Sequence, residues 1–549
     1  MSIRILVFFM SVWIGFSFSI AQNVSPDMAL NEMTQFGLKI NVSKIRYAAS
    51  TQNGRIKPFD TLARETILFL TGTYKKWGLD ANQIYLTISS LEASAFAPII
   101  EIRSIELRQR LGFLPDKKYF SLADLESSQL QNLAMPILQK EQEGQKLNEE
   151  DKKFVEAFSQ MNLFKQIAMK QHFIRSLDFS WLEKAEPDEN SPVIVNAKKY
   201  LELLQSQKFD EAFTLSELLN RLTREQNAPE LFKHSLSKLE MEVFFFDFRP
   251  FLWASLIGLL GGLALLIDAT RKKITTKMIY TFFGLIMSFI ILGLGMRVYI
   301  TQFAPITNMY GTMIWVAFGV TFFSLMLYVL YKNPIMSGFM LLASGLILML
   351  TENIPLVLSP DMDPIVAVLR SNFWLSTHVT TITISYAAFT IAMVLGNVTL
   401  VKEIFSLTKP NQIQDFFHYA YRMVQLGCFL LTVGIILGGV WADYSWGRFW
   451  GWDPKETWAL IADLGFLILL HARYIGWLKP FTFLAFLPVS YLLVIMAWYG
   501  VNFILAAGLH SYGFSSGGAK AVGVFVSMQL ILIIVAWIRF RTHHSKQSH

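Results

Sequence analysis

The chain has 549 residues, more than one ordinary domain holds, and 53% of them are hydrophobic against 16% that are charged. This composition excludes a purely cytosolic enzyme. The single cysteine, Cys428, excludes an internal disulfide, a cysteine-based zinc site and a cysteine-ligated iron–sulfur cluster within this chain, so a metal would be held mostly by histidine. The net charge is +7, but no basic run is interleaved with stacking aromatic residues, and we therefore expect no nucleic-acid partner.

Residues 1–21 predict a secretory signal peptide. Arg4 is followed by a short apolar core that ends in small residues at Ser19 and Ala21. Residues 22–248 would then lie outside the cytoplasm. An uncleaved anchor helix is the alternative, and it would leave these residues on the same side.

Residues 22–248 predict a mostly helical extracytoplasmic domain. Gly112 and Gly144 are the two glycines between positions 82 and 248, and segments such as 198–206 and 211–222 repeat apolar residues at three- and four-residue spacing. His172 and His234 have no partner at ligand spacing. We expect surface or half-buried roles for both.

Nine apolar segments follow, each long enough to cross a bilayer core of roughly 30 Å. We place them at 250–269, 278–299, 311–331, 335–352, 374–401, 417–440, 455–473, 481–504 and 521–539. If residue 249 lies outside, the inner loops and tail hold thirteen Lys and Arg residues and the outer loops hold six, as the positive-inside bias requires. The sequence thus predicts an all-α protein: a polytopic bundle at 249–540 in the cytoplasmic (inner) membrane, an outer N-terminal domain and a cytoplasmic tail at 541–549.

Five of the 14 tryptophans lie between residues 441 and 458, in a predicted outer loop. Residues 446–458 read Trp-Gly-Arg-Phe-Trp-Gly-Trp-Asp-Pro-Lys-Glu-Thr-Trp. An interfacial aromatic belt is one interpretation. However, Asp-Pro-Lys-Glu at 453–456 is a helix-start signature, which places the loop at the positive end of a transmembrane helix. Flat rings beside exposed amides, Arg448 and Lys455 suit a large planar ligand that carries carboxylates, such as haem.

Three histidines are candidate axial ligands of a haem iron. On the predicted topology His378 lies at the outer start of the fifth span and His510 just past the outer end of the eighth, at the same face as the tryptophans. A hydrogen-bonded boundary residue is the alternative for each. His471 lies 17 residues beyond Pro454, roughly 26 Å inward, and Asp463 is the other ionisable residue in that span. We expect Asp463 to pair with a polar neighbour.

The run 446–458, together with the three histidines, resembles the tryptophan-rich "WWD" signature of haem-handling proteins of cytochrome c biogenesis. Within that group it is similar to the CcsA (ResC) family, the membrane half of the System II cytochrome c synthase. Pro305-Ile-Thr-Asn308-Met-Tyr310 is also similar to that family, and the resemblance covers residues from about 250 to 540.

The resemblance implies a protein that binds and translocates haem b and joins its vinyl groups to the thiols of an apocytochrome c Cys-x-x-Cys-His segment. It implies that His378 and His510 are the external axial pair and the catalytic residues, and that His471 is one ligand of a transmembrane haem site. The implied surroundings of the external haem are Trp446, Arg448, Trp450, Trp452, Asp453, Lys455 and Trp458.

Two departures from that family affect its partners and alternatives. The second transmembrane ligand there comes from CcsB (ResB), and the spans at 250–352 contain no histidine, which implies a CcsB-type partner chain. The domain at 22–248 lies outside the minimal family, although its segment 54–64 resembles one in extended or fused members. A haem transporter or chaperone that forms no covalent bond is an alternative function. A haem-b redox subunit is another, for which we would expect paired histidines at similar membrane depth, whereas this chain has one.

Overall fold

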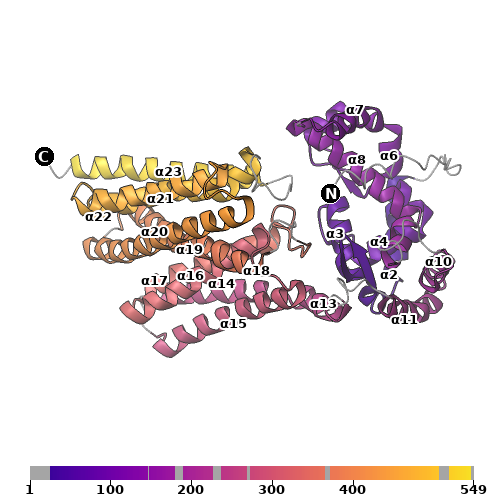
Figure 1. Cartoon of the computed structure of the whole chain (residues 1–549), viewed down its shortest axis with the longest axis horizontal. Coiled ribbons are helices and arrows are strands. Elements are labelled where there is room, and N and C mark those ends of the chain that lie inside the picture. Colours follow the sequence, from indigo (N-terminus) through magenta and orange to yellow (C-terminus); the bar gives the residue numbers. More distant parts are fainter. Residues whose placement is uncertain are drawn as a thin grey trace. The chain divides into compact units, whose positions relative to one another are not determined.

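The computed structural model describes residues 25–145, 147–179, 189–226, 236–268, 273–364, 371–407, 409–505 and 518–545. The chain divides into two compact units, Met1–Phe244 and Phe245–His549 (Figure 1). The predicted signal peptide lies outside the described residues.

The first unit is mainly helical, with one hydrophobic core that extends through most of its helices. Its helices are α2 (Pro26–Leu38), α3 (Phe59–Thr71), α4 (Ala81–Ser90), α5 (Ile105–Arg110), α6 (Leu122–Ser127), α7 (Leu130–Gln142), α8 (Glu149–Ala168), α9 (Gln171–Leu177), α10 (Pro192–Gln205) and α11 (Phe209–Glu225). Helix α13 (Leu239–Phe248) crosses the boundary between the units. His172 is half-buried, as expected, and its Nδ1 lies 2.6 Å from the Tyr85 hydroxyl.

Three short antiparallel strand pairs, absent from the sequence prediction, complete the first unit, and the first two of them are hairpins. Strand β1 (Ala49–Gln52) pairs antiparallel with β2 (Arg55–Pro58), β3 (Lys75–Lys76) with β4 (Leu79–Asp80), and β5 (Ile100–Glu101) with β6 (Tyr119–Phe120). The first hairpin turns at Asn53 and Gly54, whose φ angles are 53° and 76°, as a tight type I′ turn requires.

Buried ion pairs fix the first hairpin and α3, which together contain segment 54–64. Arg46 and Arg64 both bind the fully buried Asp60, at 3.0 Å and 2.6 Å. Arg55 binds Glu242 of α13 through two hydrogen bonds of 2.8 Å and 2.6 Å, and Thr61 donates a third to the same carboxylate. The bonds to Glu242 join residues that are more than 180 positions apart in sequence.

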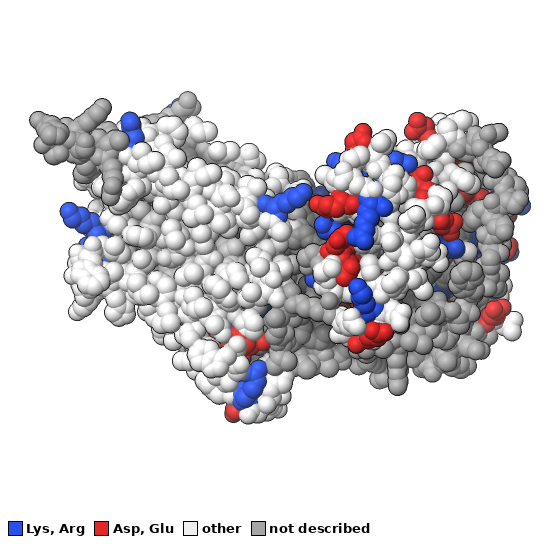
Figure 2. Space-filling model, turned by 90° about the horizontal axis from the view of Figure 1, so that it is seen from above, with Lys and Arg blue, Asp and Glu red and all other residues white. Residues whose placement is uncertain are grey.

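The second unit is a bundle of long apolar helices. Within the described residues, nine helices are long and apolar enough to cross a membrane, which confirms the predicted polytopic bundle. They are α14 (Pro250–Asp268), which α13 extends, α15 (Thr276–Thr301), α16 (Met309–Tyr331), α17 (Pro334–Asn353), α19 (Thr380–Ile404), α20 (Pro410–Trp446), α21 (Pro454–Tyr474), α22 (Pro480–Ile495) and α23 (Ala519–Ser545). On the face shown in Figure 2, charged side chains gather over the first unit, and the helices of the second unit present a nearly uncharged surface.

Two of these helices continue as π-helices at the ends that the predicted topology places outside. The short α18 (Asn372–Trp374) and the π-helix η6 (Leu375–Val379) lead into α19, and η7 (Met496–Leu505) continues α22. Such wide turns are rare and are frequent at functional sites. Segment η6 contacts α20 and η7 contacts α21, so the two π-helices lie beside the two helices that the tryptophan run connects.

Candidate functional site

His378 lies in η6 with its ring half-buried against α20. Its Nδ1 is 2.8 Å from the main-chain oxygen of Gly434. A carbonyl oxygen can only accept a hydrogen bond, so Nδ1 carries the proton and Nε2 carries the lone pair that a metal needs. The hydrogen bond therefore fixes the tautomer in which Nε2, and not Nδ1, has the lone pair for a metal.

The notch that receives this ring is made by residues the sequence analysis did not single out. A Cβ added to Gly438 would lie 2.5 Å from His378 Cε1, so the absence of a side chain there makes room for the imidazole. Trp441 meets the ring edge-on, with centroids 5.7 Å apart and planes at 65°. The signal in the sequence was the four-residue spacing of Gly434 and Gly438, which lets helices approach closely in a membrane.

The tryptophan run is less of a loop than predicted. Helix α20 continues to Trp446 and ends at Gly447 with φ 67°, so Trp441 and Trp446 are helical residues and the connection to α21 is short. The predicted start of the next helix is confirmed. The Asp453 side chain accepts from Lys455 N at 3.0 Å, and the Glu456 side chain accepts from Asp453 N at 3.2 Å.

The connection exposes the ring of Trp452 and half-buries Trp450 and Arg448. Trp452 is 71% exposed and adopts φ 56°, which is uncommon for a bulky residue and is typical of functional sites. Its ring stands perpendicular to that of Trp450, with centroids 5.8 Å apart. The Arg448 guanidinium lies 5.9 Å from the Trp446 ring centroid and 3.8 Å from a Glu456 oxygen. Within the described part of the chain, Arg448 Nη1 is buried and makes no hydrogen bond.

The other predicted residues of this group lie at the start of α21 or beyond η7. Lys455 and Trp458 lie in the first turn of α21 and are half-buried, whereas the Asp453 side chain is buried. His510 lies outside the described residues. It follows η7, which lies beside α21.

His471 lies near the opposite end of α21 and is exposed on the surface of the bundle. Its Nδ1 is 2.7 Å from the main-chain oxygen of Leu467, so its lone pair too is on Nε2. It continues an exposed apolar stripe at three- and four-residue spacing. The stripe comprises Ile461, Leu464 and Ile468, which are 37%, 49% and 66% exposed.

Two other histidines with described side chains have different partners. His418 Nε2 lies 3.1 Å from the amide nitrogen of Gln414 and accepts from it, so its lone pair is used. His172 Nδ1 faces the Tyr85 hydroxyl. Among these four rings, the bond from Nδ1 to a main-chain oxygen separates His378 and His471 from the others.

Asp463 is the other ionisable residue predicted at membrane depth. Its side chain is buried, and Thr432 of α20 donates a hydrogen bond to it at 2.7 Å, which confirms a polar neighbour. In the described residues no three His, Cys, Asp or Glu side chains come together in a metal-binding group. Axial ligation of haem iron needs only one or two side chains.

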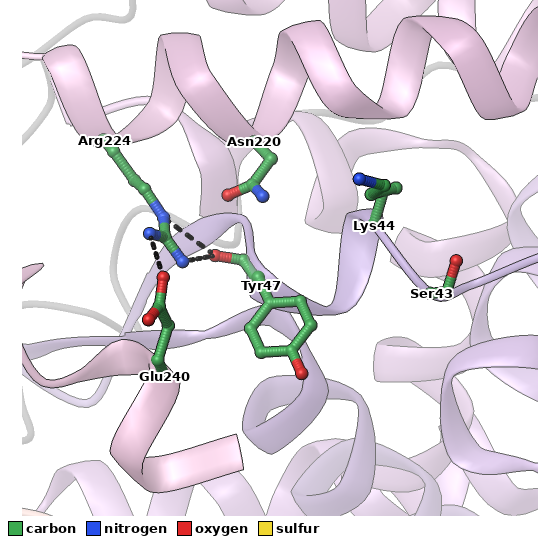
Figure 3. A pocket seen from close by; sticks show the side chains of 6 residues that line it. All are labelled: Ser43, Lys44, Tyr47, Asn220, Arg224 and Glu240. Atoms are coloured by element: carbon green, nitrogen blue, oxygen red, sulfur yellow. Dashed lines mark hydrogen bonds and ion pairs between the residues drawn. The ribbon is translucent and has the colours of Figure 1, made fainter. Parts of the chain in front are cut away.

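The first unit has a separate cavity of about 370 Å³, lined mainly by polar and charged side chains (Figure 3). It is lined by Ser43, Lys44, Tyr47, Asn220, Arg224 and Glu240. The Arg224 guanidinium donates to Tyr47 O and to the Glu240 carboxylate, as the dashed lines in Figure 3 show. None of the predicted site residues lines this cavity.

Comparison with known proteins places the second unit among cytochrome c assembly proteins. The family model described as "Cytochrome C assembly protein" matches residues 306–510. The chain is 33% identical to the cytochrome c biogenesis protein CcsA of Prochlorococcus marinus over 306 residues, which cover 48% of this chain and 95% of that protein. It is 36% identical to CcsA of Chlamydomonas reinhardtii over 225 residues, 38% of this chain and 61% of that protein.

A longer relative also matches part of the first unit. The chain is 27% identical to the protein NrfI of Wolinella succinogenes over 506 residues, which cover 84% of this chain. Residues 245–549 alone are too few to supply that share, so the alignment extends into the first unit. The chain covers 53% of NrfI and thus about half of that protein's length.

Proposed function

The chain belongs to the CcsA family of cytochrome c biogenesis proteins and is a multi-pass membrane protein, and from this we propose that it carries haem b across the membrane and presents it for attachment to apocytochrome c. In this proposal the membrane is the cytoplasmic (inner) one, with the first unit outside and the C-terminal tail in the cytoplasm. With a CcsB-type partner the chain acts as a holocytochrome c synthase.

The observation that carries the proposal is the shared tautomer of His378 and His471. Each ring donates from Nδ1 to a main-chain oxygen, at 2.8 Å and 2.7 Å, which leaves the lone pair on Nε2. One ring lies beside the outer end of α20 and the other near the inner end of α21. This placement supports two haem sites at opposite ends of the α20–α21 helix pair.

For the external site, we propose that His378 and His510 are the axial pair and the catalytic residues. The Trp446, Trp450, Trp452 and Trp458 rings provide the apolar bed, and the Asp453–Glu456 capping box fixes the start of α21 beside them. Arg448, with Nη1 buried and without a hydrogen bond, and Lys455 provide donors for the haem carboxylates.

The chemistry assigned to the external site is the addition of a thiol S–H across a haem vinyl group. The sulfur bonds to one vinyl carbon and a proton to the other, so no external oxidant is consumed. The contribution of this chain is positioning, because a vinyl group held in one place raises the effective concentration of the incoming thiol.

For the transmembrane site, we propose that His471 provides one axial ligand and a CcsB-type partner the other. An exposed imidazole within an apolar stripe is costly in lipid, and a partner helix packed along Ile461, Leu464 and Ile468 would cover it. The partner's histidine would then face His471.

The first unit is proposed to dock the apocytochrome or the CcsB-type partner, and its alignment with NrfI supports a role beyond the minimal CcsA chain. Loss of residues 23–248 should therefore abolish maturation. Normal maturation by the shortened chain would reject this role.

The decisive experiment co-expresses this chain, with and without a CcsB-type protein, beside an apocytochrome c in a host that lacks its own maturation system. Haem-stained cytochrome that needs both chains supports the synthase. Bound haem without attachment supports the alternative, a haem transporter or chaperone.

Point variants assign the axial ligands in the same assay. His378→Ala or His510→Ala should abolish maturation, and added imidazole should restore part of it because it fills the vacant coordination position. His418→Ala is the matched control and should mature cytochrome normally. Full maturation by the His378 or His510 variant without imidazole would contradict the axial pair.

A further inference from the structure

A buried arginine at the outer end of α15 holds the loop that follows α17. Arg297 is 2% exposed, and its Nη1 donates to the main-chain oxygen of Pro360 at 2.8 Å. Its Nη2 lies 3.4 Å from the main-chain oxygen of Asp361. The guanidinium also lies 4.9 Å from the Tyr310 ring centroid. A buried guanidinium that binds main-chain oxygens fixes a loop rather than a helix face.

Asn308 holds the same loop from the start of α16. Its Nδ2 donates to Ser359 O at 3.1 Å and to Asp361 O at 2.9 Å, while its Oδ1 caps α16 by accepting from Gly311 N at 2.8 Å. Arg297 and Asn308 thus converge on residues 359–361, and we call this pair the loop clamp.

The clamped segments contact η6, which carries His378, and Gly518, at the start of the described segment that holds α23. Just before Asn308, Phe303 and Ala304 pack in one apolar cluster with Leu375 and Val379 of η6, the π-helix that carries His378. On the clamped loop, Val357 lies against Gly518, where an added Cβ would come within 2.6 Å of Val357 Cγ1. Gly518 is the first described residue after His510.

We propose that the loop clamp, Arg297 with Asn308, is a positioning device that sets the position of η6 and with it the ring of His378. This inference rests on the proposed external haem site. The segment between Arg297 and Asn308 packs on η6 through Phe303 and Ala304. A change in the clamp therefore displaces His378 while its imidazole remains present.

Asn308→Asp tests the clamp with little change in shape. Aspartate caps a helix as well as asparagine does, so α16 keeps its start, but a carboxylate cannot donate to Ser359 O and Asp361 O. Asn333→Asp is the matched control. Asn333 caps α17 by accepting from Met336 N at 3.2 Å, and it lies at the opposite end of α16.

Three readouts are compared in the full chain co-expressed with its CcsB-type partner: cytochrome c maturation, its rescue by imidazole, and carbon monoxide binding to the reduced haem. For Asn308→Asp we expect maturation to fall by about tenfold, imidazole to restore it, and carbon monoxide to bind because one axial bond is weakened. Asn333→Asp should match the wild type. If Asn308→Asp does not accumulate, Arg297→Lys replaces it, because a lysine keeps the charge but not the planar fork.

The outcomes separate the clamp from the site it supports. If Asn308→Asp equals Asn333→Asp in all three readouts while His378→Ala loses maturation, the external site stands and the clamp is refuted. If His378→Ala itself matures cytochrome normally, the axial pair is refuted and the clamp with it. A fall in maturation without imidazole rescue and without carbon monoxide binding would make the clamp a folding element only, which also overturns the proposal.

Discussion

Gly438→Ala should damage the external site by moving one ring. An ideal Cβ at this position lies 2.5 Å from His378 Cε1, and ordinary contact begins at 3.4 Å, so the imidazole must retreat by about 0.9 Å. A displacement of about 1 Å in a reacting geometry costs on the order of a hundredfold in rate. The helix itself should be favoured by about 0.5–1 kcal/mol, because alanine loses less backbone entropy than glycine. A loss of function therefore would not reflect a weaker α20.

The assay is cytochrome c maturation by the full chain with its partner, with Gly295→Ala as the matched control. Gly295 lies in α15, and a Cβ added there meets nothing within 4 Å. We expect about a hundredfold loss for Gly438→Ala, partly reversed by imidazole, and no loss for Gly295→Ala. Wild-type maturation by Gly438→Ala would refute the placement of His378 in the notch on α20.

Two further predictions concern the stability of the first unit. Both are tested by the urea concentration at which this unit becomes protease-sensitive in the detergent-solubilised full chain. Burial lowers the pKa of His172 from 6.5 to about 4, so between these two pH values the unfolded chain binds a proton that the folded chain does not. The free energy of unfolding should therefore be constant above about pH 6.5 and fall toward pH 4, by up to about 3 kcal/mol. A pH-independent midpoint over that window, or the same fall in His172→Gln, would contradict this. Glu242→Ala should lower the free energy of unfolding by about 3–5 kcal/mol, because it removes the carboxylate that binds Arg55. Glu240→Ala, which breaks an exposed pair with Arg224, should lower it by under about 1 kcal/mol. Equal losses would show that the Arg55 pair is not a structural anchor.

The parts of the fold that the sequence could predict are those that local chemistry determines. Membrane spans depend on about 20 consecutive apolar residues, and the nine helices follow from that alone. The start of α21 depends on four neighbouring residues, and the capping box formed as expected. The Asn53–Gly54 hairpin also had a local signal, since this dipeptide favours type I′ turns, but it was not recognised among the surrounding helices.

The end of α20 was mispredicted because hydropathy reports membrane depth and not helix length. Tyr444 is 81% exposed and Asp443 and Ser445 are polar, so this last part of the helix resembles a loop in sequence although its backbone continues to Trp446. As a result, Trp441 was assigned to the loop and its contact with His378 was missed.

The His378 notch and the loop clamp depend on contacts between distant segments. Gly434 and Gly438 matter because α19 packs on α20, and Arg297 matters because residues 359–361 fold back to it. No local pattern encodes either pairing. The resemblance could supply the candidate ligands, but not the hydrogen bonds from Nδ1 that define which nitrogen is available.

The absorption spectrum of the purified chain, prepared with its CcsB-type partner and an ample haem supply, tests the central claim most directly. The wild type should show a Soret band and the low-spin spectrum of a bis-histidine haem, and His378→Ala and His510→Ala should each change that spectrum while His418→Ala leaves it intact. A colourless wild-type preparation, or a spectrum that neither axial variant changes, would contradict the account.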